Sequence, residues 1–229
     1  MALAPHEFWQ ALDPPGTHPK AGPFATSWPA TLPDGRQLLL PIRVLPGDGT
    51  HGVAGLISNQ ASLVVLDALV EAMTAMLAGY RPDIIIGVPT LGLPLAEGIA
   101  RRLGHSRLLP LSTSRKFWYR EELSEPLSSI TTPERRKSLF IDPRLLPLLD
   151  GRRVVVIDDV VSSGQSMVAT LRLLRKVGVA PAAVGVAMMQ GDKWRAALAA
   201  EDAGWPALVH GVFGSPLLRL SSQGWQPAD

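Results

Sequence analysis

The sequence contains no cysteine among its 229 residues. Disulfide bonds, thiol nucleophiles and cysteine metal sites are therefore excluded, and a reducing cytoplasm is the simplest location to expect. The five histidines are scattered without the spacing of a zinc site, so no structural metal is indicated. Residues 1–10 have no basic segment followed by an apolar one, and we expect no signal peptide.

Net charge is also scarce. The formal charge is +2 although the isoelectric point is near 9.2, so the field of the whole molecule is too weak to predict binding to nucleic acid. The apolar stretch at residues 61–78 is interrupted by Asp67 and Glu71 and falls short of a membrane span. We therefore expect neither nucleic acid nor a membrane among the partners.

The chain also lacks the GxxxxGK[ST] and GxGxxG motifs, which argues against a nucleoside triphosphatase or a dinucleotide-binding fold. Its length allows one large domain with a small subdomain. Hydrophobic residues make up 46% and charged residues 18%, a composition typical of a folded protein.

The chain divides into three parts. Residues 1–60 are rich in proline and glycine and predict an irregular N-terminal arm or hood, with a short strand at 37–45. Residues 61–213 alternate between apolar strand patterns and amphipathic helix patterns. Strands are expected at 83–88, 106–111, 138–141, 153–157, 182–189 and 208–213, and helices at 62–79, 93–103, 164–176 and 193–201. Residues 214–229 form a C-terminal tail. This alternation predicts an α/β fold with an open, mostly parallel twisted sheet flanked by helices.

The segment VVVIDDVVSSGQSM, residues 154–167, is the most informative. Its uncharged β-branched run is typical of a strand buried on both faces, and two acids, Asp158 and Asp159, follow that run. The acids should therefore lie at the carboxyl edge of the sheet, where open α/β sheets bind ligands. A small polar loop at the start of a helix comes next, and its backbone N–H groups and dipole favour a phosphate. Acids beside a phosphate site suit a sugar phosphate.

The alternative is that the acids only cap the following loop and that the serines are an ordinary helix N-cap. The position of the whole string at the carboxyl end of a strand favours the ligand site.

This string resembles the phosphoribosyl pyrophosphate signature of type I phosphoribosyltransferases, and the resemblance extends in order over residues 83–213. It implies that Asp158 and Asp159 hold the ribose hydroxyls. The residues implied to surround the 5′-phosphate are Ser162, Ser163, Gly164, Gln165 and Ser166. The family also implies Mg²⁺, which Asp158 and Asp159 would contact only indirectly or through the substrate. It further implies a homodimer and a hood over the base, formed by residues 1–60 alone or together with the C-terminal stretch.

Two further segments resemble the family, most closely the adenine and purine enzymes. Pro89, Thr90, Leu91 and Gly92 are similar in position to its pyrophosphate-binding loop, although alone they fit a plain βα turn. Arg115 and Lys116 resemble the pair that opens its flexible loop and would stabilise the leaving group, although alone they fit a solvated basic turn. Residues 112–136 are about twice as long as an ordinary connection, and we expect them to form a lid that excludes water.

The sequence departs from the family at the general acid/base. Ser162 stands where hypoxanthine-guanine enzymes have an acid, and residues 128–132 contain no glutamate where adenine enzymes supply one. Glutamates occur nearby at Glu121, Glu122, Glu125 and Glu134, so the acid/base stays unassigned. Trp118 and Phe213 are candidates to stack on the base, although aromatic side chains more often pack in cores.

The resemblance therefore implies transfer of a 5-phosphoribosyl group from phosphoribosyl pyrophosphate to a nitrogenous base, expected to be a purine, with release of pyrophosphate. A regulatory protein that senses phosphoribosyl pyrophosphate without turnover is the alternative. A structural protein on a plain α/β scaffold is a third, but it leaves the acids and the loop without a purpose.

Overall fold

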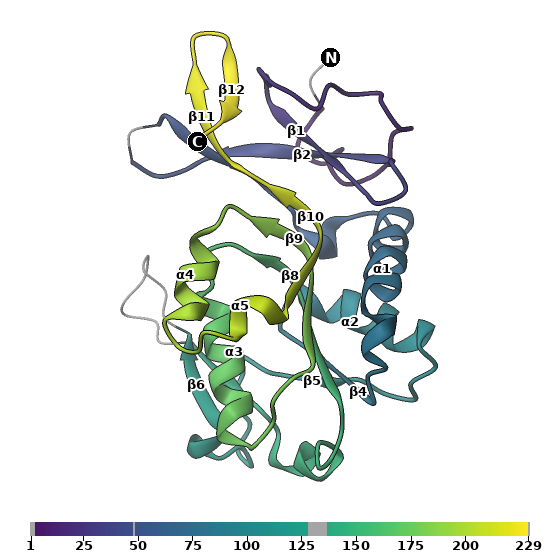
Figure 1. Ribbon diagram of the computed structural model, residues 1–229, viewed down its shortest axis with the longest axis vertical. Coiled ribbons are helices and arrows are strands. Elements are labelled where there is room, and N and C mark those ends of the chain that lie inside the picture. Colours follow the sequence, from purple (N-terminus) through teal and green to yellow (C-terminus); the bar gives the residue numbers. More distant parts are fainter. Residues whose placement is uncertain (1–2, 48, 128–136, 229) are drawn as a thin grey trace.

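The computed structural model describes residues 3–47, 49–127 and 137–228. A parallel sheet forms its centre, helices cover both faces of that sheet, and an antiparallel sheet lies beyond one end (Figure 1). The predicted α/β fold with a hood is confirmed.

The central sheet has the strand order β10-β9-β8-β4-β5, and every neighbouring pair is parallel. Its members are β4 (Ile84–Gly87), β5 (Leu109–Pro110), β8 (Val154–Val161), β9 (Ala183–Gln190) and β10 (Val209–Ser215). The interior strands β8 and β9 are buried along almost their whole length, as the apolar run Val154–Ile157 of β8 and the largely apolar sequence of β9 require. Because the strands are parallel, their carboxyl ends meet at one edge, which faces the hood (Figure 1).

Two hydrophobic clusters hold the helices to the sheet. The helices are α1 (Leu63–Leu77), α2 (Gly92–Arg102), α3 (Gln165–Lys176), α4 (Lys193–Ala199) and α5 (Trp205–Leu208). The α1 and α2 side chains pack with Ile85 and Val155, whereas the α3 and α4 side chains pack with Ile86 and Val156. Alternate residues of each strand therefore serve opposite layers.

The first helix begins where its cap predicts, because the Ser62 hydroxyl accepts a hydrogen bond from the Val65 N–H at 3.2 Å. The segment Leu63–Tyr80, which joins α1 to the short 3-10 helix η2 (Ala78–Tyr80), is long and apolar enough to cross a membrane by length and composition. Leu69, Met73 and Leu77 of this segment are fully buried in the protein core, and core helices pass the same test.

The hood is a five-stranded antiparallel sheet in the order β1-β2-β3-β11-β12. Its strands are β1 (Ser27–Thr31), β2 (Gln37–Val44), β3 (His51–Ala54), β11 (Leu217–Ser221) and β12 (Gly224–Pro227). Residues 3–26 form no helix or strand, as predicted for an irregular arm, but the prediction missed β1 and β3, and the predicted tail at 214–229 contains the strands β11 and β12. Pro29 misled the prediction because it lies on β1, an edge strand, where a missing N–H is tolerated.

Three strands differ from their predicted form, and the strand expected at 106–111 is reduced to β5. The strand expected at 153–157 continues to Val161, because Asp158, Val160 and Val161 stay in register with β9. The strand expected at 138–141 is β7 (Lys137–Phe140), which pairs with β6 (Ser124–Leu127) in a separate antiparallel hairpin. The predicted lid at 112–136 thus includes a strand, and its residues 128–136 lie outside the described residues.

The remaining short elements are the 3-10 helices η1 (Ser58–Gln60), η3 (Glu121–Leu123) and η4 (Pro143–Leu148). Of these, η1 lies between the hood and α1, and η3 belongs to the expected lid.

Candidate active site at the carboxyl edge of the central sheet

Asp158 and Asp159 lie in the last half of β8 and are almost completely buried, with 7% and 8% of their surfaces exposed. The Asp159 N–H donates to the Asp158 carboxylate at 2.9 Å. Burial raises the pKa of both carboxyl groups, and the charge of Asp159 raises the pKa of Asp158 further. Neither acid has a Lys or Arg ion pair in the described part of the chain. Groups that donate hydrogen bonds to them would therefore stabilise the site.

The loop at 162–166, called here the Ser/Gly loop, follows directly on β8 and leads into the first turn of α3. Ser162, Ser163 and Ser166 are exposed, so packed side chains do not cover the loop. Gly164 has φ +82°, and a Cβ there would lie 3.0 Å from the Trp194 Cα, so both conformation and space require glycine. Residues 160–167 line a cavity of about 120 Å³ at this point. An open loop at a helix N-terminus suits an anion.

The loop at 89–92, called here the Pro/Gly loop, contacts β8 directly. The Val88 N–H donates to the Ile157 carbonyl at 2.9 Å, and an added Cβ on Gly92 would lie 2.8 Å from the Asp158 Cα. The peptide between Pro89 and Thr90 is cis. The two motifs, 66 positions apart from Gly92 to Asp158, are thus in contact at the first acid.

Sequence reasoning missed two residues that support these loops. The fully buried Ser58 donates its hydroxyl to the Leu91 carbonyl at 2.7 Å. The Gln190 side chain accepts from the Ser162 hydroxyl at 2.9 Å and donates to the Ala54 carbonyl at 2.6 Å. Ser58 lies between the hood and α1, and Ala54 ends the hood strand β3, so both hydrogen bonds join the carboxyl edge to the hood side of the molecule. No local sequence motif marks either Ser58 or Gln190.

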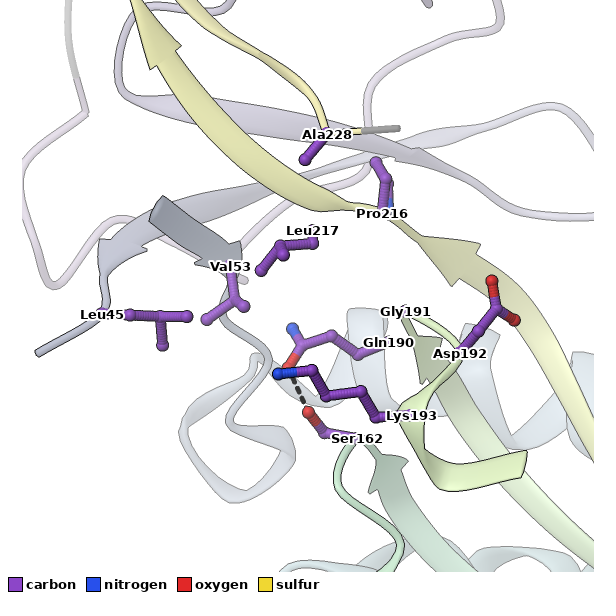
Figure 2. Close-up of a pocket in the computed structure, with 10 residues that line it drawn as sticks. All are labelled: Leu45, Val53, Ser162, Gln190, Gly191, Asp192, Lys193, Pro216, Leu217 and Ala228. Atoms are coloured by element: carbon purple, nitrogen blue, oxygen red, sulfur yellow. Dashed lines mark hydrogen bonds between the residues drawn. The ribbon is translucent and has the colours of Figure 1, made fainter. Parts of the chain in front are cut away.

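A cavity of about 370 Å³, called here the hood pocket, lies between the hood and the carboxyl ends of β8 and β9 (Figure 2). Its lining residues come from both parts: Leu45, Val53, Ser162, Gln190, Gly191, Asp192, Lys193, Pro216, Leu217 and Ala228. None of these residues is aromatic.

The structure does not bring the predicted aromatic residues to the site. The Trp118 ring N–H donates to the Asp142 carboxylate at 3.2 Å, and the Arg144 guanidinium lies 4.5 Å from the ring centre. Phe213 is 6% exposed and belongs to the core cluster beneath the hood. Phe213 thus packs in the core, as aromatic residues more commonly do, whereas Trp118 stays 37% exposed and contacts Asp142 and Arg144.

Of the predicted cations and glutamates of the lid, Arg115, Glu121 and Glu125 form ion pairs away from the acid pair. Arg115 forms an exposed ion pair with Glu121 at 3.1 Å, and the neighbouring Lys116 and Glu122 are exposed. The buried Glu125 lies 2.8 Å from the Lys176 ammonium, at the end of α3 opposite the Ser/Gly loop. Glu134 lies outside the described residues. Thus no described lid glutamate is placed as the general acid/base.

The acids fit a magnesium ion that is held mainly by a substrate. Among the described residues, no group of three or more His, Cys, Asp or Glu side chains could hold a metal on its own. Mg²⁺ prefers oxygen ligands, keeps several waters and commonly binds through one or two carboxylates and substrate phosphates. Asp158 and Asp159 supply the carboxylates that such a site needs.

Similar proteins of known name cover parts of the chain. A hypoxanthine/guanine phosphoribosyltransferase of Methanosarcina mazei is 31% identical over 103 residues, which are 45% of this chain and 50% of that protein. An orotate phosphoribosyltransferase of Stenotrophomonas maltophilia is 29% identical over 140 residues, 58% of this chain and 56% of that protein. The chain thus spans about half the length of these curated relatives.

Solved structures share the fold. The APRTase of Giardia lamblia has a TM-score of 0.58 at 19% identity, over 76% of this chain and 93% of that one. The adenine phosphoribosyltransferase of Thermoanaerobacter pseudethanolicus has a TM-score of 0.52 at 20% identity, over 66% and 81%. The sequence model of the phosphoribosyl transferase domain matches residues 56–202, more than half of the chain. The chain therefore belongs to the phosphoribosyl transferase domain family.

Proposed function

We propose that this protein transfers the 5-phosphoribosyl group of phosphoribosyl pyrophosphate to a nitrogenous base, with a purine as the expected class, and releases pyrophosphate. The bond from the anomeric carbon to the pyrophosphate oxygen breaks, and a bond from that carbon to a base nitrogen forms. The proposal also includes Mg²⁺ bound with the pyrophosphate, where it would neutralise charge on the leaving group.

Each part of the carboxyl edge has a role in this reaction. Asp158 and Asp159 accept hydrogen bonds from the ribose hydroxyls, and their charge favours the positive charge that develops at the anomeric carbon. The Ser/Gly loop holds the 5′-phosphate with hydroxyl and backbone N–H groups at the start of α3. The Pro/Gly loop offers backbone groups to the pyrophosphate.

One observation carries the proposal: the contact between Gly92 and Asp158 beside an exposed Ser/Gly loop. That contact brings the two family loops to the two sides of one buried acid pair. A ribose carrying a phosphate at one end and a pyrophosphate at the other would match this spacing of anion sites around carboxylates.

Pyrophosphate release in the presence of Mg²⁺ and a panel of purine and pyrimidine bases tests this function. We expect release with at least one base and none without phosphoribosyl pyrophosphate. Binding of phosphoribosyl pyrophosphate without release for any base would favour a sensor. The sensor is a real second candidate, because no described lid glutamate is placed to act as the acid/base.

A further inference from the structure

Ser58 joins the Pro/Gly loop to the segment between the hood and α1. Its side chain is fully buried, and its hydroxyl donates to the Leu91 carbonyl at 2.7 Å. A buried hydroxyl costs stability unless it has a hydrogen-bond partner, and here the partner lies 33 positions further along the chain. The bond therefore fixes the direction of the Leu91 carbonyl.

The direction of this carbonyl sets the direction of the next N–H group. The peptide bond between Leu91 and Gly92 is trans, and in a trans peptide the carbonyl and the N–H point in opposite directions. Because the Leu91 carbonyl is directed at Ser58, the Gly92 N–H is directed away from Ser58. Gly92 is also the first residue of α2, and the first N–H groups of a helix have no partner within that helix.

Gly92 lies directly against the acid pair. A Cβ added to Gly92 would lie 2.8 Å from the Asp158 Cα and 3.0 Å from the Asp158 carboxylate oxygen Oδ1. The peptide that Ser58 holds is therefore the one that immediately precedes the contact with the acids. If the proposed function holds, the Gly92 N–H belongs to the loop that receives the pyrophosphate.

The N-terminal arm fixes the segment that carries Ser58. The Trp9 ring N–H donates to the Gly55 carbonyl at 3.0 Å, and the Trp9 carbonyl accepts from the Ser62 N–H at 2.9 Å. Gly55 and Ser62 lie on the two sides of Ser58 in the sequence. The position of the Ser58 hydroxyl is thus set before a ligand binds, which lowers the entropy cost of ordering the site on binding.

We propose that Ser58 is a positioning residue for the leaving pyrophosphate: by binding the Leu91 carbonyl, it directs the Gly92 N–H toward a pyrophosphate oxygen. Without the hydroxyl, the carbonyl loses this partner, and the peptide rotates toward another donor and turns the N–H away. A donor that is oriented in advance stabilises the charge of a leaving group without reorganisation. This inference rests on the proposed function and adds the residue that orients one of its pyrophosphate contacts.

Calorimetric titration of three ligands with Mg²⁺ tests the inference. The ligands are phosphoribosyl pyrophosphate, pyrophosphate, and ribose 5-phosphate, which carries the 5′-phosphate but no pyrophosphate. We expect Ser58→Ala to lower the affinity for the first two about 10- to 100-fold, the effect of one hydrogen bond to a charged group. The affinity of this variant for ribose 5-phosphate should equal that of the wild type.

Ser62→Ala is the matched control, because it is the same substitution in the same segment and removes the hydrogen bond that caps α1. Both variants should lower the melting temperature, since each loses a hydrogen bond. Ser62→Ala should nevertheless bind all three ligands like the wild type. If Ser58→Ala does not fold, Ser58→Cys replaces it; the thiol is a weaker donor, and the same selective loss should appear to a smaller extent.

Three results would overturn the inference: unchanged affinity for pyrophosphate in the Ser58 variant, an equal loss for all three ligands, or the same selective loss in Ser62→Ala. An equal loss for all ligands would assign Ser58 to folding alone. A wild-type protein that binds none of the three ligands would instead contradict the proposed function.

Discussion

At the scale of single residues, Asp158 and Asp159 combine burial with a lack of cationic partners in the described part of the chain. Such an arrangement costs stability when the groups are ionised, because burial disfavours the charged form. A protein keeps it only where another gain offsets the cost, and ligand binding is such a gain. We therefore expect the ionised acid pair to lower the stability of the protein and to contribute to ligand binding.

The variant Asp158→Asn tests whether the acid pair lowers stability and supports function. The pKa of Asp158 is raised above its ordinary value of 3.8 in the folded protein, so the ionised group lowers stability as pH rises through that window. We expect the melting temperature of the variant to exceed that of the wild type at pH 7, by about 2–4 °C for each kcal/mol gained in the free energy of unfolding. The difference should vanish below pH 3.8, and turnover should fall about 10²-fold or more.

Melting curves from pH 3 to pH 8 and pyrophosphate release measure the two halves of this prediction. Asp159→Asn should lose turnover to a similar extent. A variant that turns over like the wild type would refute the catalytic role of the acid it replaces.

Asp142 shows the opposite behaviour. Hydrogen bonds from Arg144 lower its pKa to about 2, and its carboxylate also accepts from Trp118. Its contribution to stability is present above pH 3.8 and is lost as pH falls toward 2. Asp142→Asn should therefore lower the melting temperature at pH 7, and the difference from the wild type should shrink near pH 2. An equal difference at both pH values would contradict this.

At the scale of elements, the contact of the Pro/Gly loop with β8 leaves no room for a side chain at Gly92. Gly92→Ala would place a Cβ 2.8 Å from backbone atoms of Ile157 and Asp158, which cannot move as a flexible side chain can. We expect a loss of about 1–3 kcal/mol in the free energy of unfolding. We also expect a fall of about 10²-fold in kcat/KM, since the displaced loop would misplace the leaving group.

Gly79→Ala is the matched control, because no heavy atom lies within 4 Å of the added carbon. Urea denaturation and pyrophosphate release should show little change in that variant. Equal activity of the two variants would mean that the loop has no role in positioning the substrate.

The sequence predicted some elements well and others poorly for identifiable reasons. β8, the Ser/Gly loop and α3 are contiguous, so one string of residues carries the strand pattern, the acids and the helix start. Ser58 and Gln190 act only because distant segments meet in space, and neither lies in a local motif. Arg115, Trp118 and Phe213 have suitable chemistry, but partners elsewhere in the fold engage them.

At the scale of the whole molecule, both ends of the chain build the hood. β11 pairs with β3 of the N-terminal part, and Trp225 of β12 packs with Phe24 and Leu218. These pairings join residues far apart in the sequence, which is why the sequence predicted an irregular arm and a tail instead of one sheet. The hood pocket depends on this sheet for its apolar wall.

Trp225→Ala tests the joint role of the two ends. Trp225 is 7% exposed, and its truncation should lower the free energy of unfolding by about 3 kcal/mol or more. The neighbouring Gln226 is exposed, and Gln226→Ala should leave stability unchanged. Urea denaturation compares the two, and equal stability would mean that the C-terminal strands are not part of the folded hood.

The most direct measurement is a calorimetric titration of phosphoribosyl pyrophosphate with Mg²⁺ into the wild-type protein and into Ser163→Asp and Ser222→Asp. Both serines are exposed, but only Ser163 lies in the Ser/Gly loop, where a carboxylate would repel the 5′-phosphate. We predict binding by the wild type and Ser222→Asp and a loss of binding in Ser163→Asp. No binding by the wild type at millimolar ligand, or equal binding by all three proteins, would contradict a phosphoribosyl site at the carboxyl edge of β8.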